Sequence, residues 1–280
     1  MNSAISIVYQ HLVKELSSIH DEAEATSLAT ILMEDLLGVS KMTRLTRPNQ
    51  VLTTDEQNRL NQALAQLLNN VPIQHIVGFA YFCGHPFKVT KDTLIPRPET
   101  EELVHLIANE NQGKLSILDV GTGTGCIPIS LALKMKEVQI TSWDISLEAL
   151  EIAKHNAQQL GAKVTFQQMD ALDITSDNKF DVIVSNPPYI PNADKQEMHA
   201  NVLDHEPGLA LFVEDADPLV FYRKIAEFAQ TNLNPNGKIY FEIHERFGTE
   251  TKELLESLGY QKVIVLKDLN GKDRMIKAQR

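Results

Sequence analysis

The feature that constrains the fold most is a regular alternation of strand-like and helix-like segments from Leu115 onward. Short apolar runs are separated by stretches in which apolar residues recur every three or four positions. Such alternation predicts an α/β domain, with a parallel sheet covered by helices on both faces. We expect strands at 115–120, 138–143, 164–168, 180–185, 238–243 and 261–268, and helices at 127–135, 147–160, 216–233 and 249–258.

The C-terminal end of the chain departs from this pattern. Asn270-Gly271 separates two extended segments, 263–269 and 273–278, and leaves no room for a crossover helix between them. Asn-Gly is a strong signal for a tight hairpin turn, which connects antiparallel strands. We therefore expect a mostly parallel sheet whose last strand is antiparallel.

The residues before this region predict two smaller parts. A helix is expected from Glu22 to Gly38, where the glycine would end it, and Thr54 is expected to cap a second helix. Residues 74–93 are rich in aromatic and β-branched side chains around the turn-like segment 83–86. We expect a helical recognition domain at 1–73, a linking β-hairpin at 74–93 and the α/β domain at 94–280.

Composition and charge narrow the class of protein. The net charge is −11, from 26 basic and 37 acidic side chains, and no run of basic residues occurs. Duplex-binding proteins usually carry a basic face, so this charge argues against direct nucleic-acid binding. Two cysteines provide no disulfide framework, and the chain contains neither a signal peptide nor an apolar run long enough for a membrane helix. We expect a cytoplasmic monomer away from membranes. We expect no bound metal, because His75 and His85 have no partner at ligand spacing.

A glycine-rich loop follows the first strand of the alternation. The loop consists of Gly121, Thr122, Gly123, Thr124 and Gly125. Glycines let the backbone turn sharply and approach a ligand where a Cβ atom would collide. The pattern differs from the dinucleotide motif G-x-G-x-x-G, because Cys126 occupies the position of the third glycine.

Three acidic residues lie where strands are expected to end. Asp144 follows the glycine loop by about twenty residues, the position from which an acid accepts hydrogen bonds from both hydroxyls of a ribose. Asp119, just before the glycines, could orient the loop or face an ammonium group of the ligand. Asp170, with Ala171, ends the third strand, where an adenine edge could be bound. These residues predict a nucleoside-containing cofactor.

The segment Asn186-Pro187-Pro188-Tyr189 follows the strand 180–185, at the sheet edge where ligands bind in α/β folds. Two consecutive prolines fix the backbone and remove two N–H donors. The side-chain oxygen of Asn186 and the carbonyl of Pro187 can therefore both accept hydrogen bonds from one –NH₂ group. Tyr189 offers an aromatic face on which a flat substrate can stack.

These acceptors address a particular chemical problem. The nitrogen of an amide or aromatic amine is a poor nucleophile, because its lone pair is delocalised. Two acceptors can aim that lone pair at a methyl sulfonium and stabilise the positive charge that develops on nitrogen. No general base is obviously needed, since the methylated nitrogen becomes acidic. We predict methyl transfer to a planar nitrogen, with Asn186, Pro187 and Tyr189 as catalytic residues.

Other functions explain part of the pattern. A DNA methyltransferase acting on adenine N6 or cytosine N4 meets the same chemical problem, but it must flip a base and grip phosphates, which the acidic charge disfavours. The same charge disfavours structured RNA as the substrate. A nicotinamide dehydrogenase would explain the glycine loop and Asp144 but not the Asn-Pro-Pro-Tyr segment. A non-catalytic binding module predicts that Asn186→Ala leaves function intact.

Taken together, the glycine loop, Asp144 and Asn186–Tyr189 resemble the motifs of class I methyltransferases that act on amino groups. The wider sequence resembles the PrmC/HemK family of protein-(glutamine-N5) methyltransferases, which modify peptide chain release factors. The resemblance runs from about Pro72 to the C-terminus, while the first seventy residues match only in being helical. It rests on the segments 72–78, 82–84, 94–101, 206–211, 222–225 and 268–274.

This resemblance implies a Rossmann-like, seven-stranded methyltransferase fold and S-adenosyl-L-methionine as cofactor, with S-adenosyl-L-homocysteine as product. The glycine loop and Asp144 would hold the cofactor, and Asn186, Asp119, Asp170 and Ala171 are further candidate contacts. Residues 186–189 would hold the glutamine amide of the Gly-Gly-Gln motif of a bacterial release factor. The chain departs from the family at His244, where glycine is common, and at Ala171, where some members have a bulky aromatic residue.

Overall fold

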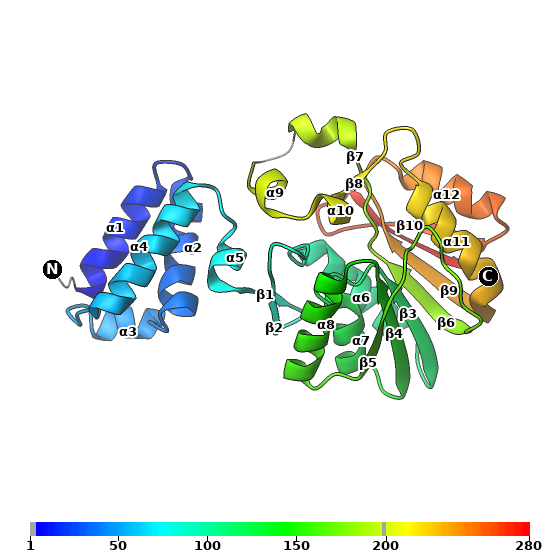
Figure 1. The fold of residues 1–280 in the computed structure, drawn as a ribbon, viewed down its shortest axis with the longest axis horizontal. Coiled ribbons are helices and arrows are strands. Elements are labelled where there is room, and N and C mark those ends of the chain that lie inside the picture. The colour runs from blue at the N-terminus through cyan, green and yellow to red at the C-terminus, as the bar shows by residue number, and fades with distance from the viewer. Residues whose placement is uncertain (1–3, 198–199) are drawn as a thin grey trace. The chain divides into compact units, whose positions relative to one another are not determined.

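The computed structural model describes residues 4–197 and 200–280, which divide into two compact units (Figure 1). The first unit contains the residues up to Gly78 together with the short helix α9 (Ala200–His205). The second unit contains the remaining described residues, 79–197 and 206–280. None of the described helices is both long and apolar enough to cross a membrane.

The first unit is helical and has its own apolar core. Its helices are α1 (Ile5–Leu16), α2 (Glu22–Ile31), a π-helical turn η1 (Leu32–Leu36), α3 (Lys41–Thr46), α4 (Thr54–Leu68) and α5 (Ile73–Val77). The capping residue of α4 is Thr53, not the expected Thr54. The Thr53 hydroxyl accepts from the Glu56 amide at 3.2 Å, and the Glu56 carboxylate accepts from the Thr53 amide at 2.7 Å. This reciprocal pair satisfies two backbone donors at the start of the helix.

The second unit is built on a sheet of seven strands in the order β10-β11-β9-β6-β3-β4-β5. The five strands β3, β4, β5, β6 and β9 are parallel, as the alternation predicts. The strands are β3 (Leu115–Val120), β4 (Val138–Asp144), β5 (Val164–Gln168), β6 (Phe180–Ser185), β9 (Leu233–Glu242), β10 (Gln261–Lys267) and β11 (Asp273–Gln279).

The expected antiparallel last strand is confirmed. Strand β11 lies between β9 and β10 and is antiparallel to both. The turn that precedes it closes where the sequence predicts, with the Gly271 amide donating to the Asp268 carbonyl at 2.9 Å. Gly271 has a positive φ of 79°, which glycine adopts without strain.

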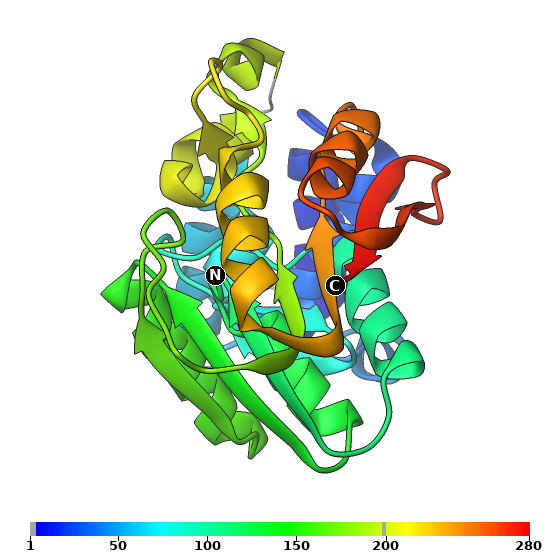
Figure 2. The same ribbon diagram turned by 90° about the vertical axis from the view of Figure 1, so that its right-hand side faces the viewer.

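Helices cover both faces of this sheet (Figure 2). One face carries α6 (Pro98–Glu110), α7 (Cys126–Lys134) and α8 (Leu147–Leu160), and the other carries α11 (Val220–Asn232) and α12 (Gly248–Ser257). Successive strand residues enter opposite cores: Val182 packs with the first set of helices and Ile183 with the second. Strand β6 is therefore buried on both sides, which explains its largely apolar sequence.

Short elements complete the second unit. They are the hairpin strands β1 (Phe79–Phe82) and β2 (His85–Lys88), the pair β7 (Ile190–Pro191) and β8 (Phe212–Val213), the 3-10 turn η2 (Asn192–Glu197) and helix α10 (Gly208–Leu211). The hairpin is shorter than the expected segment 74–93, because residues 73–77 form helix α5. Its turn is Cys83-Gly84, so His85 and Pro86 belong to a strand.

Two elements of the second unit begin several residues away from the sequence-based expectation. Helix α11 begins at Val220 rather than at residue 216. The reason is Pro218, whose ring disfavours the helical conformation at the residue before it. Strand β9 begins at Leu233 rather than at residue 238, so it includes the segment 234–237. Asn236 in that segment has a φ of 64°, and the register between β6 and β9 shifts at the same end. Residues 180 and 182 of β6 pair with residues 233 and 238 of β9, so this irregularity leaves the residues between 233 and 238 outside the regular register.

We predict that Asn156 is a main support of the second unit. Its buried amide on α8 accepts from the Lys88 amide at 2.8 Å and donates to the carbonyls of Lys88 at 3.1 Å and Thr124 at 2.9 Å. Asn156→Ala should lower the free energy of unfolding by roughly 2–4 kcal/mol, because it leaves backbone groups without partners. Urea denaturation would measure this, with Asn178→Ala at an exposed position as control. A loss equal to the control's would contradict the prediction.

Candidate functional site

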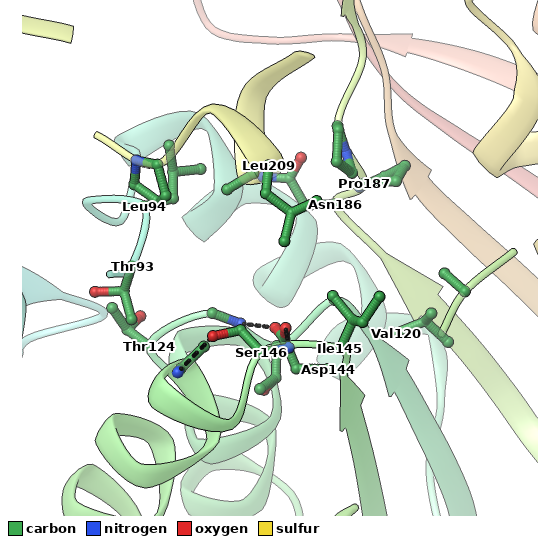
Figure 3. Close-up of a pocket in the computed structure, with 18 of the residues that line it drawn as sticks. Thr93, Leu94, Val120, Thr124, Asp144, Ile145, Ser146, Asn186, Pro187 and Leu209 are labelled. Carbon is green, nitrogen blue, oxygen red and sulfur yellow. Dashed lines mark hydrogen bonds between the residues drawn. The ribbon is translucent and has the colours of Figure 1, made fainter. Parts of the chain in front are cut away.

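A pocket opens at the carboxyl ends of the parallel strands in the second unit, and its cavity volume is about 430 Å³. The chain runs from β3 to β4 and β5 on one side, then returns to place β6 on the other side of β3. Ligands in open α/β sheets bind in the crevice at such a reversal. Figure 3 shows side chains from several of these loops facing the cavity, among them Asp144 and Asn186.

The glycine loop forms the floor of this pocket. Gly121, Gly123 and Gly125 all have positive φ, of 81°, 53° and 81°. The loop is tied to β4, because the amides of Gly121 and Thr122 both donate to the Trp143 carbonyl, at 2.8 and 3.1 Å. Residues 121–124 line the pocket.

Gly125 has a different role from its neighbours. It caps the start of α7 and is not among the lining residues. A Cβ atom at this position would come within 2.7 Å of Ile129 Cδ1 and 3.2 Å of Ala153 Cβ. Glycine is therefore needed here for the packing of α7 against α8, whereas a Cβ atom at Gly123 would meet nothing within 4 Å. The space above Gly123 remains available to a ligand.

Asp144 ends β4 and presents a carboxylate to the pocket (Figure 3). One oxygen accepts from the Gly123 amide at 2.8 Å, and the other accepts from the Ser146 amide at 2.9 Å. Burial raises the pKa of Asp144, and these backbone donors oppose the rise. The carboxylate is thus held in place by the loop and keeps lone pairs for the hydroxyls of a ligand.

The other acidic candidates lie in different surroundings. Asp119 is fully buried and does not line the pocket, and its carboxylate accepts from the Ser142 hydroxyl at 2.7 Å. Burial raises the pKa of Asp119 to about 7. Asp170 and Ala171 both line the pocket, and Asp170 also accepts from the Leu172 amide at 2.8 Å. Of the candidate cofactor contacts, Asp119 and Gly125 therefore lie outside the lining.

The segment 186–189 leaves β6 at the edge of the pocket. Asn186, Pro187 and Pro188 line the pocket, whereas Tyr189 does not. The Tyr189 hydroxyl donates to Glu242 Oε1 at 3.1 Å, and its ring packs edge-on against His244, with 5.8 Å between ring centroids. Burial raises the pKa of Tyr189 well above its usual range, so the hydroxyl stays protonated.

The structure adds residues that the motifs did not identify. Thr100 lines the pocket and accepts from Asn186 Nδ2 at 3.3 Å, and its own hydroxyl donates to Glu242 at 2.6 Å. Arg97 pairs with the buried Glu206 at 2.6 Å. A signal for Glu242 does exist in the sequence, because a carboxylate directly after the run 239–241 of an interior strand requires partners.

A cluster of possible metal ligands lies apart from the pocket. Cys83, Glu101 and His105 each place one such atom within 4.8 Å of the others, and none of the three lines the pocket. His105 is exposed. The cluster includes neither His75 nor His85, the two histidines considered from the sequence.

Comparison with known proteins identifies the family. Residues 98–206 match the family described as "Methyltransferase small domain", and residues 8–78 match the one described as "PrmC N-terminal domain". The release factor glutamine methyltransferase of Bacteroides thetaiotaomicron is 44% identical over 96% of this chain and 98% of its own length. The protein of the same name from Bacillus subtilis is 36% identical over 96% of each chain.

Solved structures agree on the fold. A methyltransferase from Pyrococcus furiosus covers 81% of this chain and 98% of its own, with a TM-score of 0.54 and 20% identity. A 16S rRNA N2-G1207 methyltransferase from Thermus thermophilus covers 72% of this chain and 49% of its own, with a TM-score of 0.51 and 17% identity. The second unit has the class I methyltransferase fold. With sequence identity that extends over nearly the whole chain, the protein belongs to the release factor glutamine methyltransferase family.

Proposed function

We propose that this protein transfers a methyl group from S-adenosyl-L-methionine to the side-chain amide nitrogen of the glutamine in the Gly-Gly-Gln motif of bacterial release factors. The co-product is S-adenosyl-L-homocysteine. The observation that carries this proposal is the meeting, in one pocket, of the glycine loop, the Asp144 carboxylate and the Asn186–Pro188 segment. Membership in the release factor glutamine methyltransferase family supports the choice of substrate.

The residues of the pocket fit the cofactor. Residues 121–124 would hold it along their backbone, since a Cβ atom at Gly121 would come no closer than 3.9 Å to any neighbour. Asp144 would accept hydrogen bonds from the ribose hydroxyls, and Asp170 and Ala171 would lie beside the adenine. When bound, the cofactor supplies a methyl group on a positively charged sulfur.

The segment 186–189 would hold the substrate amide. Asn186 Oδ1 and the Pro187 carbonyl would accept hydrogen bonds from the two N–H groups of the glutamine amide. Pro188 has no N–H group that could compete. Held in this way, the nitrogen directs its lone pair at the methyl group, and the acceptors stabilise the charge that develops on it. The methylated nitrogen then loses a proton to solvent. Tyr189 would border the amide with its ring, which its hydroxyl bond to Glu242 keeps in place.

The proposal extends to partners and location. Residues 1–73 would recognise the release factor, the segment 74–93 would link them to residues 94–280, and the enzyme would act as a monomer in the cytoplasm. The net charge of −11 supports action without direct nucleic-acid contact. Cys83 and Cys126 are both free thiols, which is in keeping with a reducing compartment.

The substrate assignment predicts a site-specific methylation. Incubation with labelled S-adenosyl-L-methionine and a purified release factor should place label on the Gly-Gly-Gln glutamine, as peptide mass spectrometry would show. A release factor in which that glutamine is alanine serves as the control and should remain unlabelled. Label on the control, or on duplex DNA added in its place, would overturn the assignment.

The proposed acceptor predicts a large loss of rate for Asn186→Ala. Loss of one preorganised hydrogen-bonding group from such a site commonly lowers kcat by about 10²-fold, and we expect an effect of this order. Single-turnover methylation with saturating cofactor would measure the chemical step. An unchanged rate would exclude Asn186 from the proposed role and favour a merely structural turn.

The cofactor assignment predicts that Asp144→Asn weakens binding of S-adenosyl-L-homocysteine. We expect Kd to rise by at least about tenfold, the equivalent of 1.4 kcal/mol, because the amide accepts fewer ligand hydrogen bonds. Glu148→Gln removes the same charge from an exposed position on the pocket rim and should change Kd by less than about threefold. Isothermal titration calorimetry would measure both, and equal effects would refute a direct role for Asp144.

A further inference from the structure

Glu242 is a buried acid just below the pocket. It ends the central strand β9, and only 1% of its surface is exposed. A buried carboxylate is costly unless hydrogen bonds satisfy it. Two hydroxyls do so here: Thr100 Oγ1 donates to Oε2 at 2.6 Å, and the Tyr189 hydroxyl donates to Oε1 at 3.1 Å. One carboxylate therefore joins helix α6 to the segment that follows β6.

Both oxygens of Glu242 act as acceptors, and this sets the direction of the two bonds. Burial raises the pKa of Glu242, while the hydrogen bonds from Thr100 and Tyr189 and the positive charge of Arg274 oppose that rise. Arg274 is itself held by Asp268, at 3.2 Å, across the turn between β10 and β11. Each hydroxyl therefore points its single hydrogen towards an oxygen of the Glu242 carboxylate.

This direction fixes the orientation of the Asn186 amide. A threonine hydroxyl has a single hydrogen, and that of Thr100 is used by Glu242. Thr100 Oγ1 can then offer only lone pairs to Asn186, so the amide must turn its Nδ2 group towards Thr100, at 3.3 Å. Asn186 Oδ1 lies on the opposite side of the amide. Within the described residues it accepts no hydrogen bond, and Asn186 lines the pocket.

We propose that Glu242 and Thr100 are positioning residues that make Asn186 present its oxygen, rather than its nitrogen, to the substrate. The inference rests on the proposed function, in which Asn186 Oδ1 accepts an N–H of the glutamine amide. With the amide reversed, two N–H donors would face each other and the substrate nitrogen would lose one of its two acceptors. The same carboxylate fixes the Tyr189 ring, so both ends of the segment depend on one buried charge.

The test compares Thr100→Val with Thr100→Ser. Valine has nearly the shape of threonine but no hydroxyl, whereas serine keeps the hydroxyl. We expect Thr100→Val to lower kcat for release factor methylation at least tenfold and Thr100→Ser to stay within about threefold of the parent. Thr100 also borders the pocket, so Kd for S-adenosyl-L-homocysteine is measured alongside and should change less than threefold in both variants.

A double-mutant cycle separates positioning from general damage to the site. Asn186→Asp has two equivalent oxygens, so its activity, although reduced, no longer depends on which way the group is turned. Thr100→Val should therefore lower kcat at least tenfold in the protein that keeps Asn186. In the Asn186→Asp protein the same substitution should lower kcat less than threefold. An equal decrease in kcat in the two backgrounds, or an unchanged kcat for Thr100→Val, would overturn the inference.

Glu242 itself is tested with a matched control. Glu242→Gln keeps the shape of the side chain but leaves only one acceptor for two hydroxyls, so kcat should fall at least tenfold. Glu245→Gln removes the same charge from an exposed position three residues along and should leave kcat within about threefold. Equal effects of the two substitutions would contradict the role of Glu242.

A further readout does not depend on methylation at all. In nuclear magnetic resonance spectra, the Asn186 side-chain NH₂ is identified by its absence from Asn186→Ala. One of its hydrogens should be protected from solvent exchange in the parent protein and in Thr100→Ser, but not in Thr100→Val. Absence of protection in the parent would overturn the inference. Protection without release factor methylation would instead refute the proposed function and leave the positioning intact.

Discussion

The parallel pairing of β3 with β4 on one side and β6 on the other is the constraint on which the rest of the site depends. It brings the ends of three strands to one edge, so that the glycine loop, Asp144 and the segment from Asn186 share a pocket although they are far apart in sequence. Strands buried on both faces hold this edge rigidly. The loops can then be irregular, with positive φ angles and consecutive prolines, without losing their positions.

Beneath the pocket, apolar packing gives way to a few buried polar groups. The buried Glu242 accepts hydrogen bonds from Thr100, which is also buried, and from the partly buried Tyr189. Such groups contribute little to net stability compared with apolar packing of the same volume. They determine direction instead, because two carboxylate oxygens that both accept leave each hydroxyl one way to point its hydrogen. The pocket lining determines which molecules bind. The buried polar groups instead determine how the Asn186 amide is oriented.

The sequence was most informative where structure is local. The strands at 115–120, 164–168 and 180–185 have the predicted bounds, and the first and last of them are short, mostly apolar runs. Predictions were wrong where neighbours override local preference, as at residues 234–237, which a bulge admits into β9. The motif residues of the pocket could be proposed from their places at strand ends. The contact of Thr100 with Glu242 could not, because 142 positions separate them and only the assembled fold brings them together.

The position of β11 has a consequence for the order of assembly. Strand β11 fills the gap between β9 and β10, so β10 has no place in the sheet until the strand after it has been synthesised. Until β11 docks, β9 carries an open hydrogen-bonding edge, and such edges invite pairing with other chains. The hairpin turn at Asn270-Gly271 limits that interval, because β10 and β11 can form a local pair before both dock. The sheet can therefore close only after residues 273–279 have been made.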